Sequence, residues 1–585
     1  MHRSVMLIAG AAAAVLLVAA TATATTQRTT SAKGAESAAA PFSQAWANVP
    51  RTTAGREAAN VVVFGAEQDI DGFNTSLACC NELWANYMGG IEAVRGAFIQ
   101  NNKGVWTKDL VSSASADKSG VTYTIKSNAN WYWGGKKVPV TYKDFLYTLQ
   151  QIDSKANFAS LTGTTGYGNL DPSHFTHKGL KTVKFFWRTK GCSDNYPCGA
   201  YANWQSLFSG VYPATALAGQ DFTKIWTNCI CGNNGQPVSD GPYYVSNYTK
   251  GQGTTLKANP FFYGSKPKIG EIDFKLYTDT NTEVQAMRGG EVDAITPTFG
   301  QNLTALKGVS GITFNQIPGY YYEHLEFNET KSSSNPLLRS PWMREAIALG
   351  INRAGIINTV YGSLAGNTKP MDNAIFYSTE APYKADFSKW NYNPTKALAI
   401  LKAHCSGGPS SVGGGGTWTC SGFPAKFRWT WTAGNVTRQN TEAIVKSELH
   451  DIGIDLTEDS LPANVVFGPN GIPGKNYDIA EFAEITSGDP GDWYDLYRCA
   501  GGSNYTGYCS NKVTDLMKKG NAELNPTQRI KDFQAADTIM ATSVPVFPMY
   551  QRPTPLIYKS NLLGMVNNPT TFGPFWNIEG WHWKS

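Results

Sequence analysis

One short stretch of the chain concentrates side chains that could do chemistry. It reads EITSGDPGDWYDLYRC, from Glu484 to Cys499, and it places four carboxylates among aromatic side chains: Glu484, Asp489, Asp492 and Asp495. Two carboxylic acids on either side of a cleft can hydrolyse a glycosidic bond, and acids can also line a ligand-binding pocket. A solvated loop is the third interpretation, and spacing within one loop does not decide among them.

Sequence signatures of other catalytic chemistry are missing. The chain has no G-x-S-x-G, no G-x-x-x-x-G-K-[ST], no H-E-x-x-H and no G-x-G-x-x-G motif. His174 and His177 are three residues apart, but proline and glycine flank them, which favours a surface turn over a metal site. We therefore expect a protein that is not an enzyme and has no cofactor or metal. A secreted hydrolase that uses two carboxylates of the 484–495 loop is the alternative from another class.

Length and composition bound the architecture. The chain has 585 residues, of which 42% are hydrophobic and 16% charged, so it is longer than one compact core usually holds. We expect two or three lobes in an extracellular, loop-rich protein. The net charge of +5 is spread without long basic runs, which argues against nucleic acid as a partner.

The N-terminus predicts export. A basic start is followed by an apolar run from Val5 to Ala20 and then by small residues, the pattern of a secretory signal peptide, which we assign to residues 1–26. The apolar run is short for a membrane span, although an uncleaved anchor stays open. Residues 27–58 are rich in Ala, Ser and Thr and are predicted to be a flexible tether. The expected location is periplasmic, cell-surface or extracellular.

Ten cysteines agree with an oxidising compartment. Three pairs can close small loops: Cys192 with Cys198, Cys405 with Cys420, and Cys499 with Cys509. The other four form two doublets, Cys79–Cys80 and Cys229–Cys231. Neighbouring cysteines bridge each other only with strain, so we expect pairing between the doublets, and a four-thiolate metal site is the alternative.

Strand and helix patterns occur together in both halves of the chain. NVVVFG, Asn60 to Gly65, is typical of a buried strand. A helix is expected to begin after Thr141, whose hydroxyl can cap the first turn. Another is expected to begin at Ser340-Pro341 and to continue to Gly362. Because strands and helices mix in both halves, we predict α/β lobes.

Several stretches, in a fixed order, resemble the peptide/nickel class (family 5) of extracellular solute-binding proteins of ABC importers, the group of the dipeptide- and oligopeptide-binding proteins. The resemblance covers about residues 60 to 565 and rests on the following segments: YTIKSNANWYWGGKKVPVTYKDFLYTL from Tyr123, SDGPYYVSNY from Ser239, Lys257 to Ile295 ending in GEVDAI, LEFNET from Leu325 with the helix SPWMREAIALGINRAGIINTVYG, and YNPTKALAIL from Tyr392. Each motif alone is weak, but their common order is specific.

The resemblance implies an α/β, two-lobed periplasmic-binding-protein fold of the class II type with an extra inserted domain and a hinge between the lobes. In its terms, domain I comprises residues 59–97, 236–317 and 551–585, domain II residues 98–235, and domain III residues 318–550. The implied function is to capture a peptide or peptide-like solute and deliver it to ABC permease subunits at the membrane, as a monomer. An oligosaccharide-binding member of the same family is the alternative.

The resemblance also implies where the ligand binds. In dipeptide binders an aspartate three residues before the G-D-P aspartate pairs with the peptide's ammonium group, and its position here is Thr486. Glu484 or Glu481 can replace it only if the loop shifts. The family's second cysteine in this region supports a Cys499–Cys509 disulfide. The predicted ligand-binding residues are Asn74, Tyr320, Tyr321, Tyr322, Glu484, Thr486, Asp489, Trp493 and Tyr494, with Tyr320 and Tyr322 on one side of an extended segment and Tyr321 on the other.

Overall fold

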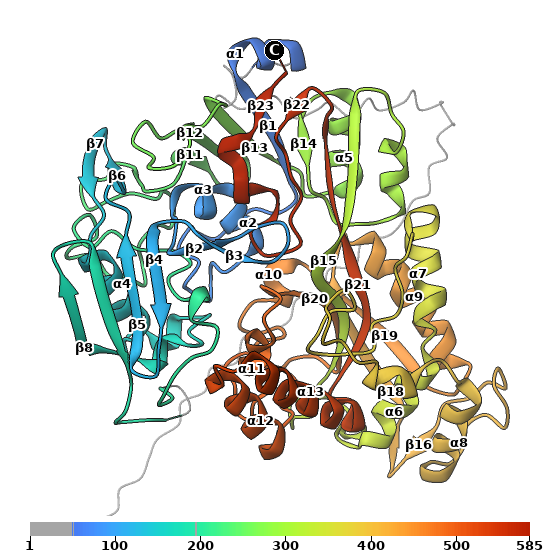
Figure 1. Ribbon diagram of the computed structural model, residues 1–585. Coiled ribbons are helices and arrows are strands. Elements are labelled where there is room, and N and C mark those ends of the chain that lie inside the picture. Colours follow the sequence, from blue (N-terminus) through green and yellow to red (C-terminus); the bar gives the residue numbers. More distant parts are fainter. Residues whose placement is uncertain (1–49, 51, 194–195, 585) are drawn as a thin grey trace, which may run out of the picture. The chain divides into compact units, whose positions relative to one another are not determined.

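The computed structural model describes residue 50, residues 52–193 and residues 196–584 (Figure 1). Chain contacts divide the protein into residues 1–47 and residues 48–585, and every described residue belongs to the second unit. The predicted signal peptide and most of the predicted tether lie outside the described residues. Within the described part, no helix is both long and apolar enough to cross a membrane.

One ten-stranded sheet runs through the described unit. Its strands, in spatial order, are β11 (Tyr243–Thr249), β12 (Gly253–Ala258), β13 (Glu271–Leu276), β1 (Val61–Ala66), β14 (Ala294–Ile295), β21 (Val546–Lys559), β15 (Ile312–Phe327), β20 (Ile479–Ile485), β18 (Lys426–Thr432) and β19 (Asp455–Leu461). The long antiparallel strands β15 and β21 lie in the middle and connect the β1 half of the sheet to the β20 half (Figure 1). The predicted buried strand is β1, whose six residues are all buried.

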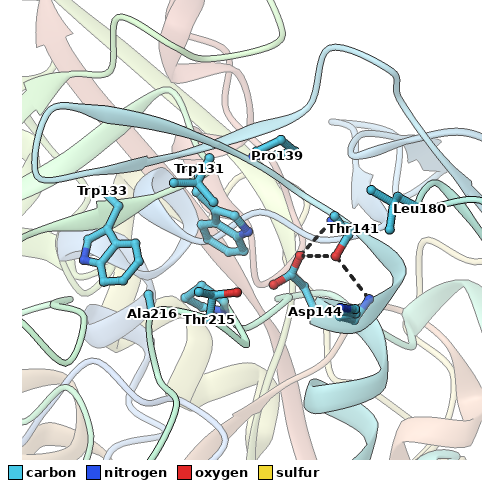
Figure 2. Close-up of a pocket in the computed structure, with 11 residues that line it drawn as sticks. Trp131, Trp133, Pro139, Thr141, Asp144, Leu180, Thr215 and Ala216 are labelled. Carbon is cyan, nitrogen blue, oxygen red and sulfur yellow. Dashed lines mark hydrogen bonds between the residues drawn. The ribbon is translucent and has the colours of Figure 1, made fainter.

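Residues between β1 and β11 build a separate part with its own apolar core. It contains a four-stranded sheet and a three-stranded ribbon: β4 (Val111–Ala116), β5 (Gly120–Ile125), β9 (Thr182–Trp187) and β8 (Leu170–Lys178), and β10 (Val238–Ser239), β6 (Asn130–Trp133) and β7 (Lys136–Pro139). Helix α4 (Tyr142–Ile152) begins as predicted, because Thr141 and Asp144 form a reciprocal capping box (Figure 2). The hairpin β2 (Phe98–Gln100) and β3 (Trp106–Lys108) leads into this part.

Helices cover the β20 half of the sheet. They are α6 (Pro341–Gly350), α7 (Arg353–Tyr361), α8 (Pro394–His404), α9 (Val436–His450), α12 (Asn511–Ala522) and α13 (Pro526–Ser543). The helix predicted to run from Pro341 to Gly362 is two helices, so that prediction is wrong in its middle. The chain is extended at Ile351, and the Asn352 side chain accepts a hydrogen bond from Gly355 N at 3.0 Å, which starts a new helix.

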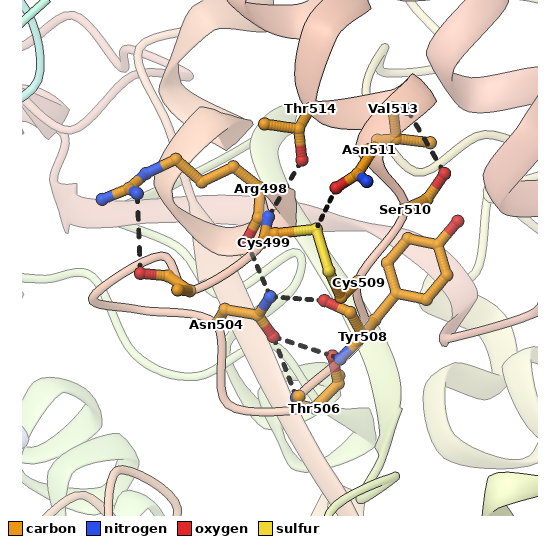
Figure 3. Close-up of a disulfide and its surroundings, with 12 residues drawn as sticks. Arg498, Cys499, Asn504, Thr506, Tyr508, Cys509, Ser510, Asn511, Val513 and Thr514 are labelled. Carbon is orange, nitrogen blue, oxygen red and sulfur yellow. Dashed lines mark hydrogen bonds between the residues drawn. A yellow bond between two sulfur atoms is a disulfide. The ribbon is translucent and has the colours of Figure 1, made fainter. Parts of the chain in front are cut away.

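The disulfides agree only in part with the sequence prediction. The three predicted pairs are confirmed: Cys192–Cys198, Cys405–Cys420 and Cys499–Cys509. Figure 3 shows how the side-chain amide of Asn504 donates to the backbone oxygens of Arg498 and Tyr508 beside the last of these bridges. The predicted pairing between the doublets is wrong, because the structure joins Cys79 to Cys80 and Cys229 to Cys231. The Cα atoms are 3.8 Å apart in the Cys79–Cys80 doublet and 5.3 Å apart in the Cys229–Cys231 doublet, so each cysteine is close to its partner.

The predicted tether ends too late in the sequence. Residues Thr53–Ala59 form helix α1, which Thr52 caps by accepting a hydrogen bond from Gly55 N. Arg56 on this helix is buried and its Nε donates to Asp293 at 2.6 Å. A buried ion pair fixes the helix against the first half of the sheet, so residues 53–58 belong to the folded unit.

Replacing Arg56 by Ala should lower the free energy of unfolding by about 3–5 kcal/mol, because the buried Asp293 carboxylate loses its charged partner. Urea denaturation of the purified protein measures the change. Arg288→Ala, which removes an exposed arginine of α5 (Thr280–Gly289), is the control and should cost less than about 0.5 kcal/mol. Equal losses in the two variants would contradict a stabilising role for the buried pair.

Candidate functional site

Three of the four carboxylates in the 484–495 stretch bond to their own surroundings. Asp489 pairs with Arg529, whose Nη1 donates at 2.7 Å. Asp492 accepts from the backbone N and hydroxyl of Ser487 at 2.8 and 2.6 Å. Asp495 accepts from Arg498 at 2.9 Å. These bonds shape the turn η10 (Pro490–Trp493) and the helix α11 (Tyr494–Tyr497), so the acids organise the loop.

The fourth carboxylate, Glu484, lies on β20 opposite Tyr322 of β15. Strand alternation puts His324 and Glu326 on the same side of β15 as Tyr322, next to Phe482 of β20. We call these five residues the Glu484 cluster: Tyr322, His324, Glu326, Phe482 and Glu484. The imidazole ring of His324 stacks at 4.8 Å from the Tyr322 ring and meets the Phe482 ring at 4.5 Å. The two acids thus lie toward opposite ends of the row, with the His324 and Phe482 rings between them.

The acids of the Glu484 cluster have His324 as their one potential cation among the described residues. Glu326 lies 3.7 Å from His324 Nε2 and accepts a hydrogen bond from the Tyr477 hydroxyl at 3.2 Å. Among the described residues, no lysine or arginine pairs with Glu326 or Glu484, and both ring nitrogens of His324 lack a hydrogen-bond partner. An arrangement of this kind is suited to a positively charged group that comes from outside the chain.

Burial raises the pKa of Glu484 to about 7, and the nearby Glu326 carboxylate adds to the rise while His324 opposes it. The side chain nevertheless keeps part of its solvent exposure. A carboxyl group that is surrounded by protein and still accessible lies where a small molecule can reach it. It is therefore the acid in this region that is best placed to meet a ligand.

Aromatic side chains from two further segments support the cluster. The Tyr322 hydroxyl lies 2.5 Å from the Tyr497 hydroxyl, and its ring packs edge-on against Trp493 at 5.1 Å. Trp493 itself is 1% exposed, and its Nε1 donates to the backbone oxygen of Ile375 at 2.7 Å. Trp493 thus lies behind the cluster as a core residue, and its contacts are to protein.

Thr486 is also engaged with protein. Its hydroxyl lies 3.1 Å from the hydroxyl of Tyr377, which donates to the backbone oxygen of Tyr320 at 2.6 Å. The rings of Tyr320 and Tyr377 stack with their centres 5.1 Å apart. At the position where the dipeptide-binding relatives were expected to have an aspartate, this chain has a buried, neutral hydroxyl group.

The structure places the other predicted residues away from the cluster. Tyr321 points to the opposite face of β15, where the guanidinium of Arg552 lies 5.6 Å from its ring. Asn74 is buried, donates to Phe222 O at 2.9 Å and accepts from the Tyr212 hydroxyl at 2.7 Å. Asp489 and Tyr494 belong to the loop after β20, where Tyr494 packs against Arg498.

Glu481, the other replacement considered for the missing aspartate, is fully buried on the opposite face from Glu484. The indole N–H of Trp429 donates to its carboxyl group at 3.2 Å. Burial, together with the charge of Glu323, raises its pKa well above the usual value. A ligand does not reach Glu481 in this arrangement.

Segments far apart in the sequence meet beside the cluster. The side chain of Gln100, at the end of β2, donates to the backbone oxygen of Ser487 at 2.8 Å, and its backbone oxygen accepts from Asn568 at 3.0 Å. Ala202 N donates to Asn521 O at 2.7 Å. The loop that follows β20 therefore contacts the part of the chain inserted after β1, and the Glu484 cluster lies close to this junction.

Sequence reasoning missed four residues of this region: His324, Glu326, Tyr377 and Tyr497. A signal existed for the first two, because they follow Tyr322 at intervals of two on an extended segment and so share its face. Nothing in the sequence connects Tyr377 or Tyr497 to β15. Tyr377 is 57 residues from Tyr320, and Tyr497, at the end of α11, is 175 residues from Tyr322. Only the tertiary fold brings such distant segments together.

The ten-stranded mixed sheet and the part of the chain inserted after β1 agree with the α/β fold expected of a solute-binding protein. Comparison with known families agrees: residues 106–507, more than half of the chain, match the model described as bacterial extracellular solute-binding proteins, family 5. The chain belongs to this family. The predicted fold and family are thereby confirmed, and membership implies an exported protein.

Curated relatives are distant. The oligopeptide-binding protein AppA of Bacillus subtilis is 22% identical over 363 residues, which are 60% of this chain and 62% of AppA. The oligopeptide-binding protein OppA of Mycobacterium bovis is 24% identical over 462 residues, 76% of this chain and 71% of OppA. The match thus spans somewhat less than two thirds of AppA's own length.

Solved structures show the same fold over most of both chains. The periplasmic EDTA-binding protein EppA has a TM-score of 0.77 at 23% identity, covering 90% of this chain and 96% of its own. AppA from Bacillus subtilis in complex with a nonapeptide has a TM-score of 0.74 at 19% identity, covering 90% and 99%.

Replacing Trp493 by Ala should lower the free energy of unfolding by about 3–5 kcal/mol, because a buried indole leaves a cavity and an unpaired backbone oxygen. Urea denaturation checks this. Trp342→Ala, which removes a partly exposed tryptophan of α6, is the control and should cost less than half as much. If Trp493→Ala left stability unchanged and weakened ligand binding alone, Trp493 would be a ligand contact and its assignment to the core would be wrong.

Proposed function

We propose that this protein captures a peptide or peptide-like solute with a positively charged amino group and delivers it to the permease of an ABC importer, without catalysing a reaction. It does so in the periplasm or at the cell surface. The names of two relatives, both oligopeptide-binding proteins, support the ligand class. The family supports the role of a solute-binding subunit.

The observation that carries the proposal is the Glu484 carboxyl group, which keeps some exposure and has no lysine or arginine partner among the described residues. A ligand ammonium placed against Glu484 would supply that cation and gain charge-assisted hydrogen bonds. Glu484 lies two residues before Thr486 on the same face of the chain, so a shift of the ligand along β20 would bring an ammonium group to it. The neutral Thr486 then does not prevent recognition of a free amine.

The proposed mechanism is closure of the two lobes around the ligand. Strands β15 and β21 connect the halves of the sheet, and their register is irregular between Pro318 and Tyr322. Such irregularities bend strands, so we place the hinge there. Contacts such as that of Gln100 with the loop after β20 form on closure and open on release to the permease.

The three-part division also belongs to this proposal. Residues 98–235 would form the inserted domain II, residues 318–550 domain III, and residues 59–97, 236–317 and 551–585 domain I. The apolar cluster that contains Tyr123 supports domain II, because most of its members lie within residues 98–235. The cluster that contains Trp429 also takes in residues between Val284 and Leu306, so domains I and III share part of one core.

A thermal-shift screen of the purified protein tests the ligand class. One pool contains short peptides and the other contains oligosaccharides. A ligand at about a hundred times its dissociation constant should stabilise the fold by roughly 2.7 kcal/mol. We expect a shift with peptides. A shift with oligosaccharides alone, or no shift with either pool, would contradict the proposal.

Glu484→Gln should weaken binding of the best peptide by about 2–4 kcal/mol, roughly 30- to 1000-fold, because its ammonium group loses the carboxylate partner. Isothermal titration gives the dissociation constants. The N-acetylated form of the same peptide is the matched ligand, and it should bind the variant and the unaltered protein equally weakly. Glu345→Gln on α6 is the control variant. A loss of affinity for the acetylated peptide as large as that for the free amine would contradict an ammonium contact.

Affinity for the free amine should rise with pH up to about 7. Binding of a cation favours the ionised carboxylate, so the pKa of Glu484, about 7 in the free protein, falls in the complex. Below that pKa the gain should be at most about tenfold per pH unit. Titrations between about pH 5.5 and 7.0 measure it, because a peptide α-amine, with a pKa of about 7.7–8.0, keeps most of its protons in that range. In Glu484→Gln the affinity should no longer depend on pH. A fall in the affinity of the unaltered protein as pH rises over this range would contradict the predicted direction.

A further inference from the structure

Two short loops bring the cysteine doublets close together: the loop after β1 and the segment before β10. A methyl group added at Gly72 would lie 3.2 Å from Cys80 Sγ and 3.4 Å from Thr227 Cα, so the sulfur and this segment face the same small space. Trp226, the residue before Thr227, holds the second doublet, because its indole N–H donates to the backbone oxygen of Cys231 at 3.0 Å. The two bridges therefore belong to one local structure, which shares no residue with the Glu484 cluster.

Each doublet closes a loop that is too short to add much stability. A disulfide stabilises a fold mainly by restricting the unfolded chain, and this effect grows with the number of residues in the closed loop. The sequence separation is 1 in Cys79–Cys80 and 2 in Cys229–Cys231, against 15 in Cys405–Cys420. Stabilisation of the fold therefore does not account for the two doublets, and the reactivity of their sulfur atoms is the property that remains.

A bridge between neighbouring cysteines is also easy to reduce. The Cα atoms of Cys79 and Cys80 are 3.8 Å apart, as in any trans peptide, whereas those of most disulfides are roughly 4.4–6.8 Å apart. A departure from the usual spacing makes a disulfide more reducible. Cys79 is exposed and Cys80 is only 5% exposed, so a thiolate that arrives from solvent can attack the sulfur of Cys79.

We propose that the two doublets form a thiol–disulfide exchange site, whose co-substrate is a dithiol. A thiolate of the dithiol attacks Cys79 Sγ, the bond between the two protein sulfurs breaks, and Cys80 leaves as a thiolate. The second thiolate of the dithiol then attacks its own sulfur in the mixed disulfide and releases Cys79. The dithiol is thereby oxidised to a disulfide, the protein disulfide is reduced to two thiols, and the two protons of the dithiol pass to the cysteines. Cys229 and Cys231, both partly exposed, react in the same way.

The Cys79–Cys80 bridge lies next to a contact with the inserted part of the chain. The backbone N of Ala78 donates to Ser160 O at 2.9 Å, and the backbone N of Thr162 donates to Ser76 O at 2.9 Å. Reduction opens the ring that joins the two cysteines, so the neighbouring backbone gains freedom. These two hydrogen bonds should therefore open more often in the reduced protein.

Redox titration of the purified protein tests the site. The protein is equilibrated with defined ratios of reduced to oxidised dithiothreitol, its free thiols are alkylated with N-ethylmaleimide, and its tryptic peptides are identified by mass spectrometry. Each of the five bridges lies within a tryptic peptide of its own, so each is measured separately. Both doublets should be half reduced at a ratio at least about tenfold lower than the Cys405–Cys420 bridge, which is the internal control.

Two double variants separate reactivity from structure. Cys79→Ser with Cys80→Ser should unfold in urea at nearly the midpoint of the unaltered protein, whereas Cys405→Ser with Cys420→Ser should unfold at a clearly lower urea concentration, because its closed loop is longer. Hydrogen exchange of the Ala78 and Thr162 amides should be faster in protein reduced only at the doublets than in the oxidised protein.

The proposal is overturned if both doublets require the same dithiothreitol ratio as the control bridge. It is also overturned if the loss of Cys79–Cys80 destabilises the protein as much as the loss of Cys405–Cys420, since the doublet would then be a structural cross-link. Unchanged hydrogen exchange after selective reduction would contradict the effect on the inserted part. Because the site shares no residue with the Glu484 cluster, its failure leaves the proposed peptide-binding function untouched.

Discussion

The antiparallel pairing of β15 with β21 is the constraint on which the rest of the structure depends. These strands of 16 and 14 residues pair from Ile312 opposite Lys559 to Glu326 opposite Val546, and they are shared by both halves of the ten-stranded sheet. A one-residue slip in such a pair would turn every side chain to the other face. The register therefore decides which residues of β15 reach the Glu484 cluster and which reach the other face.

The two faces of strand β15 differ in whether their acidic side chains have arginine partners. On one face, Glu323 contacts Arg438 at 2.7 Å and Arg552 at 3.5 Å, and although burial raises its pKa, these guanidinium groups hold it below the usual value. On the other face, Glu326 and Glu484 have only His324 beside them. A buried charge without a partner is costly, so the first face serves stability, and on the second we propose that the ligand ammonium binds Glu484.

The same distinction explains which predicted residues stand apart from the cluster. Trp493, Thr486 and Asn74 have the residue types of ligand contacts, but each makes its hydrogen bonds within the protein. Polar and aromatic side chains can contact a ligand or other parts of the chain. Residue type alone therefore does not distinguish a ligand contact from a contact within the protein. His324 and Glu326 carried no motif, yet the alternation of a strand was enough to place them beside Tyr322.

The sequence by itself determined the local elements and the family: the cap at Thr141, the buried strand after Asn60, the order of the motifs and three short-range disulfides all follow from neighbouring residues. Only the tertiary structure decided the ion pair that holds α1 and the site itself. The break at Ile351 and the pairing inside the cysteine doublets are local features that the sequence prediction had wrong. The physical reason is range. Caps, turns and strand patterns depend on residues a few positions apart, whereas the contacts of Tyr322 with Trp493, and the accessibility that Glu484 keeps, depend on segments more than a hundred residues apart and on a register that local sequence does not specify.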